Sequence, residues 1–132
     1  VLYGGCKPFT RTALEDLVAS VNSTVGDYRA HGWPVVYGYG LDESSPNCKP
    51  ALQEVYGTLK ARIPGLRIMA ATNWPSKIFN SSFPMDTRVV QYQLYDHAWA
   101  EEWLAAPGKE DLGYHSIETA AGRFPQHHTP TT

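Results

Sequence analysis

Hydrophobic and polar positions along this chain follow two spacings in turn, one typical of strands and the other of helices. Runs of apolar and β-branched residues predict strands at 33–41, 66–72, 87–92 and 111–117, and residues 1–5 resemble the end of a further strand. Apolar residues three or four positions apart predict helices from Thr12 to just before His31, at 50–60 and at 97–105. Strands that alternate with helices pair in parallel through right-handed crossovers.

Five strand candidates and three helices amount to about half of an eight-stranded α/β barrel, which typically needs roughly 250 residues. We therefore predict an α/β fold, part of a (β/α)8 TIM-type barrel, over residues 1–120, with an irregular tail at 121–132. The alternative is a small open parallel sheet of the flavodoxin-like kind, which would be complete at this length. A half barrel leaves open edge strands. For the barrel we thus expect the rest of a larger polypeptide or a neighbouring subunit as partner.

Composition narrows the classes of partner and cofactor. The chain has 132 residues, a hydrophobic content of 42% and a net charge of −2, so it is globular and has no broad attraction for nucleic acid. Its apolar runs are too short to span a membrane. The segment 38–40 has the glycine spacing of a nucleotide-binding loop but lies inside a predicted strand. The five histidines form no metal-binding pattern. We predict neither cofactor nor metal.

Two further patterns point to a secreted, extracellular or lumenal protein. Cys6 and Cys48 each follow a predicted strand, so a disulfide between them is possible, and two free thiols are the alternative. Asn22 and Asn80 each begin an acceptor triplet for N-glycosylation.

The candidate catalytic residues are the pair Asp42-Glu43, which ends the strand predicted at 33–41. Barrel enzymes place their catalytic residues at the carboxyl ends of strands. Paired carboxylates are also what most glycoside hydrolases use. Neighbouring strand residues point to opposite faces, so both acids can face one site only where the strand gives way to a loop. Gly40 before the pair and Ser44 after it permit that change.

The run 37–43, followed by a helix and then by 63–69, resembles the catalytic region of glycoside hydrolase family 123 and of related uncharacterised domains. The segments 89–95 and 100–103, and the pair Gly108-Lys109, are also similar. Tyr114 matches the tyrosine of that family's Gly-Lys-x-x-Trp-x-Tyr-like stretch. The resemblance covers roughly residues 28 to 117. It departs from the family pattern at Leu112-Gly113, where a tryptophan is expected, and in the later barrel strands, which do not occur.

The resemblance implies a retaining β-N-acetylgalactosaminidase that uses the substrate's own 2-acetamido group as nucleophile. Glu43 would be the general acid and base, and Asp42 would orient the acetamido group and stabilise its developing positive charge. Substrate contacts would come from Tyr114 to the acetamido carbonyl, from the ring of Trp74 to the sugar face, and from Asn73 and Gln91 to hydroxyl groups. The ligand or substrate would be a glycan.

A second interpretation is a non-catalytic extracellular module that binds carbohydrate or serves assembly while it keeps the barrel. The missing tryptophan and later strands favour this alternative. Whether the chain is an enzyme therefore stays open at this point.

Overall fold

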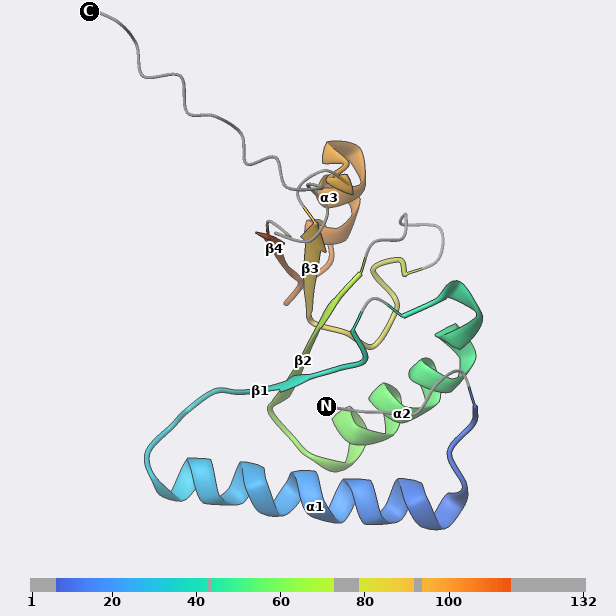
Figure 1. Ribbon diagram of the computed structural model, residues 1–132. Helices are drawn as coiled ribbons and strands as arrows, with labels where there is room; N and C mark the ends of the chain where they lie inside the picture. Colours follow the sequence, from blue (N-terminus) through green and yellow to red (C-terminus); the bar gives the residue numbers. More distant parts are fainter. Residues whose placement is uncertain (1–6, 43, 73–78, 92–93, 115–132) are drawn as a thin grey trace, which may run out of the picture.

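The structure of the protein is a computed structural model that describes residues 7–42, 44–72, 79–91 and 94–114. Helices and strands follow one another along these ranges (Figure 1), and they alternate except at residues 66–91, where two strands are consecutive with no helix described between them. In chain order they are α1 (Arg11–Ala30), β1 (Val36–Tyr39), the short 3₁₀ helix η1 (Pro46–Cys48), α2 (Lys49–Arg62), β2 (Leu66–Ala71), β3 (Thr87–Gln91), α3 (His97–Leu104) and β4 (Glu110–Tyr114). The strand expected at 1–5, the end of the strand expected at 111–117 and the tail at 121–132 lie outside the described residues.

The four strands form one open sheet in the order β1-β2-β3-β4, and each pair is parallel. The register pairs Tyr39 with Met69, Met69 with Thr87, and Thr87 with Glu110, so these four residues lie at one level across the sheet. The predicted α/β class with a parallel sheet is confirmed. The structure agrees with part of a barrel and with a small open sheet.

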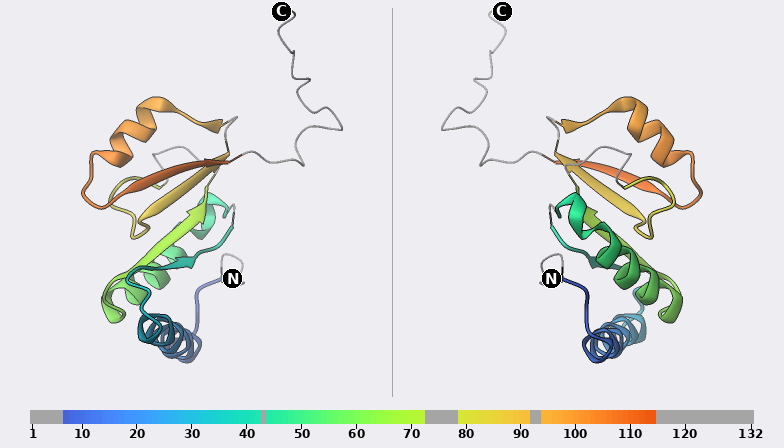
Figure 2. Two further views of the ribbon diagram at one scale, coloured as in Figure 1. Left: turned by 90° about the vertical axis from the view of Figure 1, so that its left-hand side faces the viewer. Right: turned by 90° about the vertical axis from the view of Figure 1, so that its right-hand side faces the viewer.

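The helices lie on one face of this sheet (Figure 2). On that face, Leu66 and Ile68 of β2 belong to the core that α1 and α2 build, and Arg88 of β3 lies against two tryptophans of α3. We call the opposite side of the sheet the open face. Its side chains are Tyr37, Tyr39, Arg67, Met69, Ala71, Thr87, Val89, Gln91, Glu110 and Leu112. A doubly wound sheet carries helices on both faces, whereas barrel strands carry them on one, as the described part does here.

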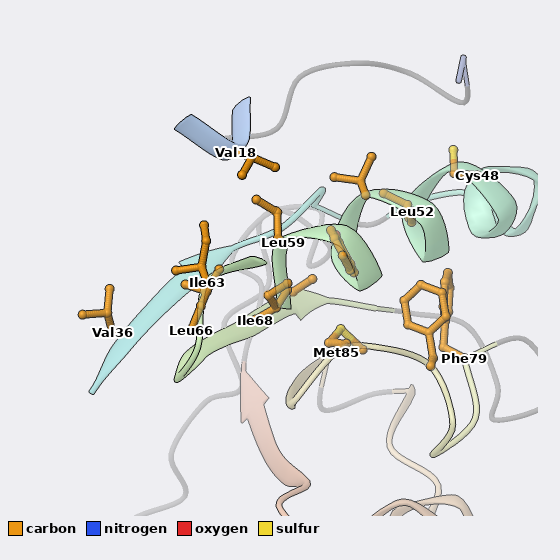
Figure 3. Close-up of a cluster of buried hydrophobic side chains, with 14 of the residues drawn as sticks. Val18, Val36, Cys48, Leu52, Leu59, Ile63, Leu66, Ile68, Phe79 and Met85 are labelled. Atoms are coloured by element: carbon orange, nitrogen blue, oxygen red, sulfur yellow. The ribbon is translucent and has the colours of Figure 1, made fainter. Parts of the chain in front are cut away.

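The hydrophobic core fills the space between β1 and β2 and the first two helices (Figure 3). Helix α2 contributes Leu52, Val55, Tyr56 and Leu59, which recur at helical spacing and are all buried. The connection between β2 and β3 closes the core with Phe79, Phe83 and Met85. Helix α1 buries only Val18 and Val25 completely. None of the described helices combines the length and the apolar character that crossing a membrane requires.

Local signals explain where the helices begin. Thr10 caps α1, because its hydroxyl accepts the Ala13 N–H at 3.2 Å. Asp96 caps α3 by accepting the Trp99 N–H at 2.9 Å. Pro50 lies in the first turn of α2, where its missing N–H costs nothing.

The first strand is shorter and less buried than predicted. It spans Val36–Tyr39 instead of 33–41. Trp33 stacks on Tyr28 of α1, with ring centroids 5.0 Å apart and an interplanar angle of 6°. Because this contact draws the chain toward the end of α1, the residues before Val36 do not join the sheet.

A buried ion pair joins the second half of the sheet to α3. Arg88 is fully buried, and its Nε lies 3.1 Å from Oδ1 of Asp111, its register partner on β4. The guanidinium lies 3.7 Å from the ring centroid of Trp99 and 5.7 Å from that of Trp103. The charge is thus neutralised by one carboxylate and covered by two aromatic rings.

Candidate functional site

The site begins where β1 ends. Gly40 continues the ladder beyond β1 by donating its N–H to the Met69 carbonyl oxygen at 2.7 Å, and the chain then leaves the sheet. Asp42 is exposed, and its Oδ1 accepts a hydrogen bond from the Tyr39 hydroxyl at 3.0 Å. Tyr39 belongs to the open face, so the phenol holds the Asp42 carboxylate at the carboxyl edge of that face. Asp42 thus follows the end of β1 by three residues.

A second tyrosine holds the same segment from the helix side. The Tyr56 hydroxyl of α2 accepts the Leu41 N–H at 2.8 Å. Burial raises the pKa of Tyr56 to about 12, so the phenol stays neutral at physiological pH. A Cβ on Gly40 would lie 2.7 Å from Cζ of Tyr56 and closer still to its hydroxyl oxygen. Glycine at position 40 is therefore what lets the phenol reach the backbone.

Two more of the predicted site residues lie at the same edge of the sheet. Gln91 is the last residue of β3, is 7% exposed and pairs in register with Tyr114, the last residue of β4. Thr87 of β3 and Glu110 of β4 are level with Tyr39 in the sheet. Gln91 and Tyr114 each lie four positions further along their strands, and Asp42 lies three positions after Tyr39. The strand β1, which precedes Asp42, and the strand β3, which ends at Gln91, are two strand spacings apart, roughly 10 Å. The structure thus brings Asp42, Gln91 and the backbone of Tyr114 to one end of the sheet.

Three predicted site residues, Glu43, Asn73 and Trp74, lie outside the described residues, and so does Cys6. Thr72, which precedes Asn73, is buried, and its N–H donates to the Val89 carbonyl oxygen at 2.9 Å. The sheet ladder therefore reaches the residue just before the predicted Asn73-Trp74 pair.

The opposite end of the open face carries a polar cluster that the sequence did not reveal. Glu110 accepts hydrogen bonds from Thr87 at 2.7 Å and from Tyr37 at 3.0 Å, and it forms an ion pair with Arg67 at 2.9 Å. The hydrogen bond from Thr87 is the main cause that holds the pKa of Glu110 below its ordinary value. Burial raises the pKa of Tyr37, and its hydrogen bond to Glu110 adds to that rise. In barrels this amino-terminal end serves stability, and we assign the cluster that role.

A groove of about 300 Å³ lies between α1 and the edge strand β1. Its lining comes from side chains of α1, from residues 36–40, and from Leu59, Leu66 and Ile68 of α2 and β2, and Asp42 is not part of it. Because this groove is lined by core residues and not by Asp42, we do not assign it to the site. In the described ranges, no three His, Cys, Asp or Glu side chains are grouped as metal ligands.

The structure also describes most of the residues expected to carry covalent modifications. Cys48 is buried and disulfide-bonded, and Cys6 is the only other cysteine of the chain. Asn22 is exposed in the middle of α1. Asn80 is half-buried, and its Oδ1 accepts a hydrogen bond from Ser82 at 2.7 Å.

The roles of Tyr39 and Tyr56 were missed in the sequence, because both fit an apolar pattern. In the sequence, Tyr39 fits the alternating lining of a barrel strand, and Tyr56 fits the buried face of its helix. The signal for Tyr56 was present, since a buried tyrosine needs a partner for its hydroxyl. Gly40, two residues before Asp42, was the other half of that signal.

Comparison with known proteins gives no further guide, since no protein-family model, no curated protein and no solved structure matches this chain.

Proposed function

We propose that this chain supplies the Asp42-Glu43 part of a retaining glycoside hydrolase that acts on terminal β-linked N-acetylhexosamine, in the first place N-acetylgalactosamine. The observation that carries the proposal is the placement of Asp42. Its carboxylate lies at the carboxyl edge of a parallel sheet that has its helices on one face, and it accepts a hydrogen bond from Tyr39 at 3.0 Å. That is where barrel enzymes position catalytic acids. The resemblance of 37–43 and 63–69 to family 123 supplies the reaction.

In the proposed reaction, Glu43 donates a proton to the glycosidic oxygen while the acetamido oxygen of the substrate attacks the anomeric carbon. The bond to the leaving group breaks, and the aglycone departs as an alcohol. Asp42 accepts a hydrogen bond from the acetamido nitrogen and stabilises the positive charge of the cyclic intermediate. Water then opens this intermediate with Glu43 as base, which restores the proton of Glu43 and the configuration of the sugar.

The hydrogen bond from Tyr39 supports the role of Asp42. The phenol donates to Oδ1 and so orients the carboxylate, and it leaves Oδ2 for a donor from the substrate. Gln91, Asn73, Trp74 and Tyr114 are the proposed substrate contacts at the neighbouring strand ends.

Location and assembly are part of the proposal. The disulfide of Cys48 supports a secreted, extracellular or lumenal protein, because disulfides persist in oxidising compartments. Tyr37, Tyr39 and Leu112 of the open face are 41%, 42% and 50% exposed. Further barrel strands, from a larger polypeptide or from a neighbouring subunit, would bury these side chains.

One observation favours a second function, the binding of glycans without hydrolysis. Leu112 stands on the open face where the resemblance expects a tryptophan. The site therefore lacks one aromatic ring that could define the position of a sugar.

The test is hydrolysis of aryl β-N-acetylgalactosaminide and β-N-acetylglucosaminide by the intact protein. We expect Glu43→Gln and Asp42→Asn each to lower kcat by roughly 100-fold or more, as loss of a positioned acid or of charge stabilisation does. Glu54→Gln, an exposed carboxylate on α2, is the matched control and should leave kcat unchanged. Unchanged turnover in either site variant would refute the mechanism. An inert wild type that binds immobilised glycans would establish the second function.

A further inference from the structure

Asp42 is held through two contacts that come from opposite faces of the sheet. On the open face, the Tyr39 hydroxyl donates to the carboxylate at 3.0 Å. On the helix face, the Tyr56 hydroxyl accepts the N–H of Leu41, the residue directly before Asp42, at 2.8 Å. The first contact orients the side chain, and the second fixes the backbone from which it extends.

Tyr56 is a rigid support for this contact. It is 1% exposed, and its ring meets Phe83 edge-on at a centroid distance of 5.8 Å. Phe83 in turn meets Phe79 edge-on at 4.9 Å. A phenol packed in this way has one orientation, so its hydroxyl marks a fixed point for the backbone.

Gly40 shows that the contact is specific to this point of the strand. A side chain at position 40 would overlap the Tyr56 ring, whereas a Cβ on Gly38 would find its nearest atoms at 3.7 and 3.9 Å. The phenol thus occupies space that only a glycine leaves open. It accepts the Leu41 N–H at the point where the chain leaves the sheet after β1.

We infer that Tyr56 is a positioning residue for Asp42, acting through the Leu41 backbone from the helix side of the sheet. Its catalytic consequence rests on the function proposed above. A loss of this hydrogen bond would free the segment after Gly40 while the Tyr39 contact alone held the carboxylate. A displacement of about 1 Å at a catalytic group can lower a rate by roughly 100-fold.

The test compares Tyr56→Phe with Tyr28→Phe in the intact protein. Tyr28 is the matched control, since its ring stacks on Trp33 at the far end of α1. Amide hydrogen exchange at Leu41 should accelerate by about tenfold or more in Tyr56→Phe and remain unchanged in Tyr28→Phe, because only the first change removes the acceptor. Unchanged exchange at Leu41 would overturn the inference.

Kinetics separates positioning from a general loss of structure. Tyr56→Phe should lower kcat by roughly 100-fold and change KM by less than about threefold. In an Asp42→Asn background, the same substitution should cause no further loss, because its effect passes through that carboxylate. If the factors by which the two substitutions lower kcat multiply in the double variant, Tyr56 acts on folding alone, and the inference is overturned.

Failure of the proposed function gives a different result. If the wild type hydrolyses neither sugar, that function fails, and the spectroscopic readouts decide the inference alone. Tyr56→Phe must then still accelerate exchange at Leu41 and shift the carboxyl carbon resonance of Asp42. If exchange accelerates and that resonance stays in place, Tyr56 does not position the carboxylate.

Discussion

Replacing Gly40 by alanine tests the packing that fixes the end of β1. The new Cβ would lie 2.7 Å from Cζ of Tyr56 and 3.2 Å from Cβ of Ala70. Tyr56 is 1% exposed and Ala70 is 4% exposed, so neither has free space to move into. The methyl group must therefore displace the phenol or push the strand away from β2.

The cost has two parts. Inserting a methyl group into a close-packed core costs about 1 to 3 kcal/mol. Displacing the phenol also leaves the Leu41 N–H without its acceptor, which costs about 1 to 3 kcal/mol for a buried donor. We expect the free energy of unfolding to fall by about 2 to 6 kcal/mol. With a urea dependence of about 2 kcal/mol per M, the midpoint should fall by roughly 1 to 3 M.

Urea unfolding of the intact protein, followed by circular dichroism, measures this shift. Gly38→Ala is the control, because it lies on the same strand and face and its Cβ would meet only ordinary contacts at 3.7 Å and beyond. We expect it to change the free energy of unfolding by less than about 1 kcal/mol. Equal midpoints for the two variants would refute the reasoning. In a Tyr56→Ala background Gly40→Ala should cost much less, because the clash is gone.

Two further predictions concern the polar contacts of the sheet. Arg88→Met should lower the free energy of unfolding by about 3 to 5 kcal/mol, because it leaves Asp111 buried without its cation. Adding Asp111→Leu should restore most of that loss. Thermal unfolding measures both variants. A double variant no more stable than the single one would contradict this account. The Thr87 hydrogen bond holds the pKa of Glu110 below its ordinary value. The ionised form of Glu110 therefore stabilises the fold at pH values above the ordinary pKa. This stabilisation is lost as the pH falls through the lowered pKa. Wild-type stability should hence fall more steeply below about pH 4.3 than that of Glu110→Gln, and parallel curves would show that Glu110 does not contribute.

The order and type of the elements could be predicted because each described helix and strand carries its own periodic pattern. Helix α2 shows why this works, since its four buried residues and its proline in the first turn are local features. The length of β1 could not be predicted, because Trp33 is a good strand residue that stacks on Tyr28 instead. A contact between a helix end and the following loop leaves no periodic signal.

The polar contacts of the sheet depend on register, which no local pattern contains. Arg88 stands between Thr87 and Val89 and reads as an ordinary polar residue of a strand. Its burial follows only when Asp111 is paired with it across the sheet and Trp99 lies over it. The same holds for the site. Asp42 could be placed near the end of a strand because it follows an apolar run, whereas the support from Tyr56 depends on how α2 is rotated against β1.

The order β1-β2-β3-β4 has a consequence for how the protein is made. Residue 36 pairs with residue 66, residue 69 with residue 87, and residue 87 with residue 110, so each strand lies beside the strand that precedes it in the chain. A ribosome that adds about 5 to 20 residues per second supplies the partner of each strand within roughly 1 to 6 seconds. No pairing in this sheet has to wait for a distant part of the chain. The sheet can therefore grow strand by strand during synthesis, and the segment that bears Asp42 can be anchored on α2 before β3 has left the ribosome.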